Sequence, residues 1–449
     1  MKPNKKELSL FDLSMIVVSL VIGMGIFRTP VNVADKAQIP ELFYTAWIVG
    51  GLVSICGALT YAEIGSRFPV TGGYYKIFAL CYHPSIAFAI NCIIVVSNAA
   101  SVAGIALIGS EYLNNALFPS HLQTVEWKMI ISIASIAIFY TINLLGLKTS
   151  SRTQNILTVI KLALILILSC SVFFGIQQDY ISPLFETAAG TVPSWADYGK
   201  ALGVSLIAVS FTFGGYQQTI NFGGETKNPS KILPRAIILG LVIIILLYLI
   251  INLAYVKVIG FEQLKTAKSI AALLAENIFG KTGFTVLSVL IFFSVLGYVN
   301  VNLLSNPRAM YAMAEDKALP AIFAKTTKKH GVMAFSLTIF TLLSIFTLFY
   351  AKTFDKILNY IIFLDSMGMV FSASTLFYLR KKTAHLDKNS IYTIKWYPLL
   401  PALFVAAYLF VSLSIFVDDA TAASNGMIIF AAFILIYFIS SFLKRKQSL

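Results

Sequence analysis

Charged residues are scarce in this chain of 449 residues: Asp, Glu, Lys and Arg together make up 12% of it, about half the share in soluble proteins. Hydrophobic residues make up 58%, and the mean hydropathy is +0.81. A chain with so few charges lies outside the range of soluble proteins, which argues against a soluble enzyme or a cytosolic binding domain. We therefore expect an all-α membrane protein that crosses the bilayer many times.

Side chains that carry enzyme chemistry are also few. The chain has four histidines without metal-ligand spacing, and it has no G-x-S-x-G motif, no phosphate loop and no paired carboxylates within an apolar run. We expect no enzymatic activity, no cofactor and no metal site. The four cysteines have no plausible extracellular partner and are expected to be free thiols: Cys56, Cys81, Cys92 and Cys170.

Twelve apolar runs are long enough to cross about 30 Å of hydrocarbon as helices of about 20 residues. The connections are short, so residues 1–449 are expected to form a single transmembrane domain. An even number of spans places both termini on one side, and the first run lacks a cleavage site and is expected to be retained. The runs lie near residues 10–35, 42–66, 84–112, 127–147, 151–174, 199–223, 233–257, 283–312, 333–350, 356–379, 396–416 and 424–443.

The net charge of +14 would suggest a nucleic-acid partner in a soluble chain, but here the distribution of charge matters more. Basic stretches such as KPNKKE (2–7), RKKTAHLDK (380–388) and KRK (444–446) lie on the side of the termini. By the positive-inside rule that side is cytoplasmic. We expect the lipid bilayer as the partner of this chain, and no nucleic acid.

Two of the expected spans carry glycine pairs at matching positions. The first contains IGMGIF, with Gly23 and Gly25, and the sixth contains FTFGG, with Gly214 and Gly215. Five spans separate the pairs, so residues about 10–174 and 199–379 can form inverted repeats, followed by two additional helices at about 396–443. The alternative interpretation is that the glycines only allow helices to pack closely.

An interrupted helix exposes backbone groups that lipid cannot satisfy, so it is tolerated only inside protein or beside a wet cavity. At the first break one half-helix would present carbonyl groups, and the other, beginning near Ile26, would present unpaired N–H groups and a positive dipole end. An amino acid has the matching groups, an ammonium and a carboxylate. The breaks therefore favour a binding site for the backbone of an amino acid.

Three ionisable side chains lie more than about five residues from either end of an expected span, where such residues are costly and mark functional sites by default. Lys161 lies about ten residues into the fifth span, roughly 15 Å from its start, too far to reach a headgroup layer easily. We expect its ammonium to point into the bundle. There it would hold free carbonyls in place of a bound sodium ion, or carry a proton; the alternative is a structural pin without a role in transport.

The other two ionisable side chains are Arg28, three residues beyond the first break, and Asp365, about ten residues into the tenth span. Both are expected near or just outside the middle of the membrane. They could pair to form an outer gate, or each could have a separate partner. An unpaired Asp365 would instead be the stronger candidate for a proton site.

Aromatic and amide side chains supply further candidates. Phe211 lies one turn before Gly214, where it would act as a gate over the bound side chain or pack like any other aromatic residue of a bundle. Asn300 and Asn302 place amides in the eighth span. They would line a pocket for the substrate side chain or merely join helices, and the sequence leaves this choice open.

Four motifs resemble those of the amino acid/polyamine/organocation superfamily of transporters, and within it the L-type amino acid transporter branch and its bacterial relatives. IGMGIF resembles the G-S/A-G-I-F motif of the first span, and SRFPVTGGYYKIF resembles the loop after the second. FTFGGYQQTINFGGETKNPSKILPRAI resembles the sixth span and its continuation, and NPRAMYAMAEDKALP resembles the segment after the eighth. Together these motifs cover most of residues 10–320.

This resemblance implies the five-plus-five inverted-repeat (leucine-transporter-like) fold, with helices 1 and 6 interrupted and both termini cytoplasmic. It also implies that Lys161 takes the place of a sodium ion and that Phe211 is the gating aromatic. Met24 stands where many members have serine or alanine, and FTFGG lacks an acid, which argues against a cationic substrate side chain. By position, the resemblance carries the substrate-binding site to Gly23, Met24, Gly25, Ile26, Phe211, Phe213, Gly214 and Gly215.

The sequence therefore predicts a secondary active transporter of neutral L-amino acids that is independent of sodium and works as an exchanger or with proton coupling. The alternatives are a polyamine or cationic amino acid transporter, for which Asp365 is the available acid, and a membrane receptor for amino acids that does not transport. Without an extracellular cysteine, no disulfide-linked heavy subunit is expected. The absence of long tails favours a bacterial inner membrane.

Overall fold

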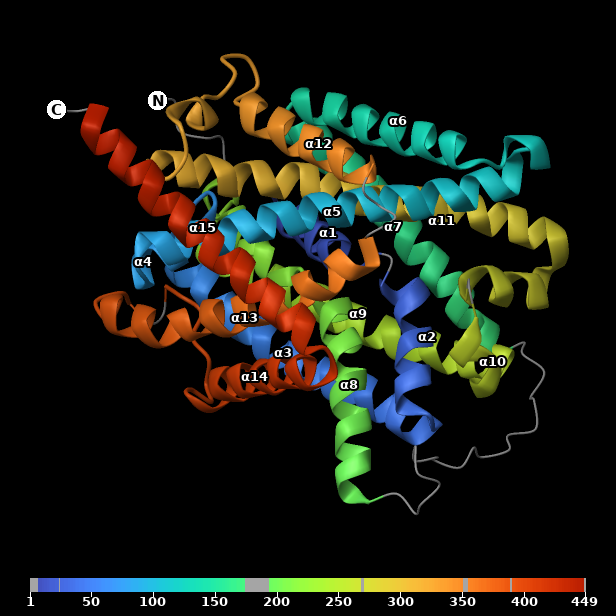
Figure 1. The fold of residues 1–449 in the computed structure, drawn as a ribbon. Helices are drawn as coiled ribbons and strands as arrows, with labels where there is room; N and C mark the ends of the chain where they lie inside the picture. The colour runs from blue at the N-terminus through green and yellow to red at the C-terminus, as the bar shows by residue number, and fades with distance from the viewer. Residues whose placement is uncertain are drawn as a thin grey trace.

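The computed structural model describes residues 7–23, 25–173, 194–267, 270–349, 354–387 and 390–447, which form an assembly of α-helices (Figure 1). Ten helical stretches are long and apolar enough to cross a membrane. In the described part of the chain, β-structure is limited to two single-residue bridges, Leu8 with Thr226 and Thr71 with Phe222. The prediction of an all-helical protein is confirmed.

Most of the expected spans correspond to one long helix each. The long helices and the short α4 and α10 that join them run as α3 (Pro40–Arg67), α4 (Gly73–Cys81), α5 (Pro84–Leu117), α6 (Val125–Leu144), α7 (Leu147–Cys170), α9 (Pro229–Ile259), α10 (Phe261–Thr266), α11 (Ile270–Glu315, with a non-helical residue at Gly280), α12 (Ala334–Phe349), α13 (Phe354–Lys382), α14 (Leu399–Asp418) and α15 (Ala420–Gln447).

Two of the twelve expected spans are not among the ten helical stretches that are long and apolar enough to cross a membrane. The span expected near 199–223 is α-helical only as far as Phe213, because Gly214 and Gly215 follow it. The span expected near 333–350 is α12, an apolar helix of 16 residues that is shorter than a typical transmembrane helix. The count of twelve therefore stays a prediction.

The first span consists of two helices, α1 (Leu10–Val21) and α2 (Gly25–Ala37). α1 begins at a capping box, in which the side chains of Ser9 and Asp12 bind each other's backbone N–H groups. It ends at Ile22, whose N–H donates to the carbonyl of Val18 at 2.8 Å. The interruption expected at GMG is thus present, although Met24 itself lies outside the described residues.

The second break is wider than the first. α8 (Trp195–Phe213) ends where the N–H of Gly214 donates to the carbonyl of Phe211 at 3.1 Å. Gly215 has a φ of +113°, a conformation that residues with a side chain rarely adopt. The chain then forms 3-10 turns at Tyr216–Asn221 (η3) and Gly223–Glu225 (η4) before α9 begins. The predicted interruption of the sixth span is confirmed.

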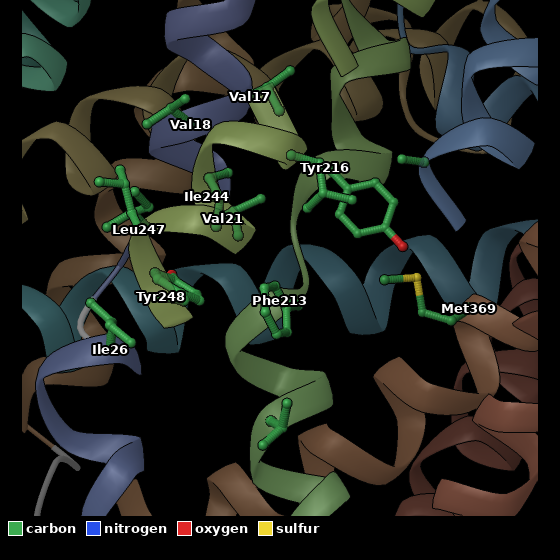
Figure 2. Close-up of a cluster of buried hydrophobic side chains, with 14 of the residues drawn as sticks. Val17, Val18, Val21, Ile26, Phe213, Tyr216, Ile244, Leu247, Tyr248 and Met369 are labelled. Atoms are coloured by element: carbon green, nitrogen blue, oxygen red, sulfur yellow. The ribbon is translucent and has the colours of Figure 1, made fainter. Parts of the chain in front are cut away.

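A buried apolar cluster holds the broken helices together. The ring of Trp47 in α3 makes edge-on contacts with the rings of Phe213 and Tyr248, with centroid distances of 5.9 Å in both cases. This packing fixes the end of α8 against α3 and α9. Figure 2 shows how α1, α2, α8, η3, α9 and α13 meet in the cluster through Val17, Val18, Val21, Ile26, Phe213, Tyr216, Ile244, Leu247, Tyr248 and Met369.

Buried ion pairs tie the helices together at the end where α1 begins. Arg308 of α11 donates from Nε to the carboxylate of Glu225 at 2.6 Å, and its guanidinium lies over the ring of Phe222. Glu63 of α3 is fully buried and accepts two hydrogen bonds from Arg380 of α13, each 2.7 Å long. Because a buried charge without its partner is costly, breaking either pair would destabilise this end of the bundle.

Candidate functional site

A cavity of about 440 Å³ lies between the two helix breaks, and its volume is in the range of small-molecule sites. The glycines of both breaks line it, namely Gly23, Gly25, Gly214 and Gly215. Further lining comes from α5, η3, α11 and α13. The structure thus brings two segments almost two hundred residues apart in the sequence to the walls of one cavity.

The two breaks approach each other so closely that side chains would not fit between them. A Cβ atom on Gly215 would stand 2.3 Å from the carbonyl oxygen of Leu20 in α1. A Cβ atom on Gly25 would stand 2.8 Å from Cγ2 of Thr212 in α8. Glycine is therefore needed at both positions to place the ends of the broken helices next to each other.

The helix ends give the cavity opposite partial charges. α2 starts at Gly25, so the N–H groups of its first turn have no partner within the helix and carry the positive end of its dipole. α8 ends at Phe213, so its last carbonyls carry a negative end. The side chain of Gln217 accepts a hydrogen bond from the N–H of Gly215 at 2.8 Å. A ligand with a carboxylate could replace this internal acceptor.

Lys161 lies beside the first break and not in the cavity wall. Its side chain is fully buried, and Nζ donates to the carbonyl of Ile22, the C-cap residue of α1. A second contact joins Nζ to Oγ of Ser19 at 3.5 Å. The ammonium thus binds a carbonyl that the break leaves without a helical partner, as the sequence suggested.

Arg28 and Asp365 line the same cavity from α2 and α13. Arg28 is exposed, and Asp365 lies close to the end of α8: a Cβ atom on Gly214 would stand 3.9 Å from Oδ2 of Asp365. Among the described residues, these two side chains do not form an ion pair with each other. An outer gate made by their pairing stays a prediction for a closed conformation.

The predicted aromatic residues fall on opposite sides of α8. Phe211 lines the cavity, whereas Phe213 is fully buried in the apolar cluster against Trp47 and Tyr248. Ile26 is also buried in this cluster (Figure 2). Phe213 and Ile26, which the sequence assigned to substrate binding, are therefore not among the residues that line the cavity, because their side chains pack away from it.

The sequence left open whether Asn300 and Asn302 of α11 line a pocket or join helices, and the structure gives a different answer for each. Asn302 lines the cavity. Asn300 does not: its Nδ2 donates to Oε1 of Gln154 at 2.8 Å, and its Oδ1 accepts from Asn143 at 2.9 Å. Asn300 thus joins α11 to α6 and α7, which is the second of the two alternatives that the sequence left open. The two residues are 200° apart around the helix, so they face different neighbours.

Several polar residues of the cavity were not predicted. They come from α5, from η3 and from α11, and they are Ser97, Asn98, Ser101, Gln217, Gln218 and Tyr298. The sequence did contain a signal for some of these residues: amides and hydroxyls lie within the apolar run of α5, and polar groups at that depth need partners. In the described residues, no group of three or more His, Cys, Asp or Glu side chains could hold a metal ion.

The sequence pattern of amino acid permeases matches residues 8–439, almost the whole chain. The chain belongs to the amino acid permease family. It is therefore a multi-pass membrane protein of a family of carriers and not of enzymes, as composition and motifs indicated. The resemblance to the amino acid/polyamine/organocation superfamily is confirmed.

Curated relatives of this permease match it from end to end. It is 29% identical to the serine/threonine exchanger of Bacillus subtilis over 455 residues, covering 99% of this chain and 98% of the relative. It is 24% identical to the human large neutral amino acids transporter small subunit 2, covering 98% of this chain and 82% of the relative. Identity to the mouse Asc-type amino acid transporter 1 is also 24%, with the same coverage.

Proposed function

We propose that this permease is a secondary active transporter of neutral L-amino acids that works by alternating access and independently of sodium. The observation that carries the proposal is the single cavity between two broken helices whose ends have opposite partial charges. Relatives named for serine and threonine and for large neutral amino acids support the neutral class. Whether transport is exchange or proton coupling is decided by the experiment below.

A zwitterion fits the two helix ends in one orientation. Its carboxylate would accept hydrogen bonds from the N–H groups at the start of α2 and from Gly215, displacing Gln217. Its ammonium would lie at the last carbonyls of α8, near the carboxylate of Asp365. Met24, which the resemblance also assigns to substrate binding, lies outside the described residues.

Lys161 is proposed to occupy the place that a sodium ion has in sodium-coupled relatives. Its ammonium supplies one positive charge at a carbonyl of the first break, in a fully buried position. A sodium ion bound there would do the same by coordinating carbonyl oxygens. This charge would hold the break without an added cation, and under proton coupling Lys161 would be the group that carries the proton.

Phe211, Arg28 and Asp365 are proposed to gate the cavity. Phe211 lines it from α8, and exposed Arg28 lines it from α2. Closing of the outer side would bring the arginine and Asp365 together over the substrate. We also propose that residues 1–449 form a single domain. It would consist of inverted repeats at about 10–174 and 199–379, followed by additional helices at about 396–443. Both termini would be cytoplasmic, and the membrane would be a bacterial inner membrane.

Uptake of radiolabelled amino acids into proteoliposomes of the purified protein tests this function. We expect neutral amino acids to enter, at the same rate in sodium and in choline medium. Uptake only into vesicles preloaded with amino acid would establish exchange, and uptake into empty vesicles driven by a pH gradient would establish proton coupling. Binding without uptake or counterflow would instead establish a receptor.

Cationic substrates are the second candidate, because Asp365 supplies a carboxylate in the cavity wall. Arg28 in the same wall opposes them through its positive charge. Arginine, lysine and putrescine therefore belong in the uptake panel. Preference for these compounds over neutral amino acids would contradict the proposed substrate class and support the alternative.

A further inference from the structure

One wall of the cavity consists of buried neutral polar side chains. Asn98 and Ser101 lie on α5, Gln218 on η3 and Asn302 on α11. Their exposed fractions are 7%, 7%, 8% and 1%, so each is more than nine-tenths buried while it lines the cavity. Below, these four residues are called the amide wall.

The amides of this wall bind one another through hydrogen bonds of unequal length. Nδ2 of Asn98 donates to Oδ1 of Asn306 at 2.8 Å, and Nδ2 of Asn306 donates to Oδ1 of Asn302 at 3.1 Å. Asn98 and Gln218 exchange two reciprocal hydrogen bonds, each 3.4 Å long. Because hydrogen bonds between nitrogen and oxygen are usually 2.7–3.2 Å long, the reciprocal pair is weak and a ligand can replace it.

The amide wall faces the part of the ligand that the helix ends do not hold. Carboxylate and ammonium are assigned to the ends of α2 and α8 under the proposed function, so the side chain is left to fill the space toward α5 and α11. An apolar side chain would remove water from these amides without supplying hydrogen bonds, which costs free energy. A hydroxyl or carboxamide group would both donate and accept, as each amide does.

The lack of charge in the amide wall and the apolar residues beyond it limit which substrate side chains fit there. The amide wall itself carries no formal charge, so a charged side chain buried against it would lose its hydration and gain only neutral hydrogen-bonding partners from this wall. Ile105 and Ile108 continue the lining along α5 toward its C-terminal end, so apolar contact lies beyond the amides. The polar end of the pocket therefore lies next to Asn98.

We infer that this transporter selects amino acids whose side chain carries a hydroxyl or a carboxamide group, as in serine, threonine, asparagine and glutamine. The inference rests on the proposed function, since it assumes that an amino acid binds between the breaks. It narrows the neutral class to its polar members. Large apolar amino acids are then poor substrates.

Pairs of amino acids with the same shape test the inference. Threonine and valine differ by a hydroxyl in place of a methyl group, and asparagine and leucine have similar branched outlines. Their concentrations for half-inhibition of uptake are measured in proteoliposomes of the full chain, with radiolabelled serine as the tracer, or with the best-transported amino acid of the panel if serine does not enter. We expect threonine to inhibit at a concentration at least about tenfold lower than valine, and asparagine likewise against leucine.

Variants of the amide wall test whether these residues cause the preference for threonine over valine. Asn302→Leu and Gln218→Met each remove the amide while keeping most of the volume, and each should bring the threonine-to-valine ratio close to one. Asn91→Leu is the matched control: Asn91 is also a buried asparagine of α5, two turns before Asn98, and its Nδ2 donates to the carbonyl of Ala87. This control should keep the ratio of the unchanged protein. Variants are compared only if they elute as a single species.

The outcomes separate this inference from the proposed function. Transport of amino acids with valine equal to or better than threonine would overturn the inference and leave the function standing. A ratio unchanged in both wall variants that fold would also overturn it. No transport of any amino acid by the folded protein would overturn the proposed function itself.

Discussion

Replacement of Gly215 with alanine is expected to lower transport at least about hundredfold, because displacement by about 1 Å at a binding site can cost that much. Its φ of +113° is unfavourable for alanine, and the new Cβ would stand 2.3 Å from the carbonyl oxygen of Leu20. That oxygen is a backbone atom, so relief requires α1 and the second break to move apart. Initial uptake rates in proteoliposomes measure the loss.

Gly199→Ala is the control for this variant. Gly199 lies in α8, the helix that leads to the second break, and a Cβ atom there would meet nothing within 4 Å. Because alanine favours a helix more than glycine does, this change should leave folding and transport intact. Wild-type transport by a Gly215→Ala protein would contradict the close approach of the two breaks.

Replacement of Lys161 with methionine is expected to have the second largest effect. Methionine keeps most of the length of the side chain but removes the ammonium that binds the carbonyl of Ile22. A hydrogen bond to a charged group contributes about 1.5–3 kcal/mol, and about 1.4 kcal/mol corresponds to tenfold. If the free energy of this hydrogen bond serves to hold the first break in its binding geometry, uptake should fall by a factor of about 10 to 150.

Lys148→Met provides the comparison, because Lys148 lies on the same helix, α7, but is exposed. Its transport rate should equal that of the unchanged protein. The role of Lys161 would be contradicted by full activity of Lys161→Met. A requirement of the unchanged protein for sodium would contradict it as well, since the ammonium is proposed to make that ion unnecessary.

The sequence predicted the positions of both breaks because the two glycine pairs stand at matching positions in apolar runs that are five spans apart. It also predicted that Lys161 points inward, since a charged group in the middle of a span must reach protein partners. The ends of the sixth span were harder to predict. Residues after Gly215 form 3-10 turns instead of a second α-helix, and the expected span of residues 199–223 did not include this change.

The direction of individual side chains could not be derived from the sequence. Asn300 and Asn302 are two residues apart and have the same chemistry, but only the rotation of α11 against α5 and α7 decides which one faces the cavity. The same holds for Phe211 and Phe213 on α8. Asn98 was missed for a related reason, because a lone amide in an apolar helix is as compatible with helix packing as with a binding site.

Competition by modified amino acids tests most directly the central claim that the two breaks hold the two charged ends of an amino acid. The amino acid that is taken up fastest is compared with its methyl ester, which lacks the carboxylate charge, and with its N-acetyl derivative, which lacks the ammonium. Each derivative loses charged hydrogen bonds that contribute about 1.5–3 kcal/mol apiece. We predict that each competes at least about tenfold more weakly than the parent amino acid. Equal competition by either derivative would contradict the claim, because the corresponding helix end would then not bind the substrate.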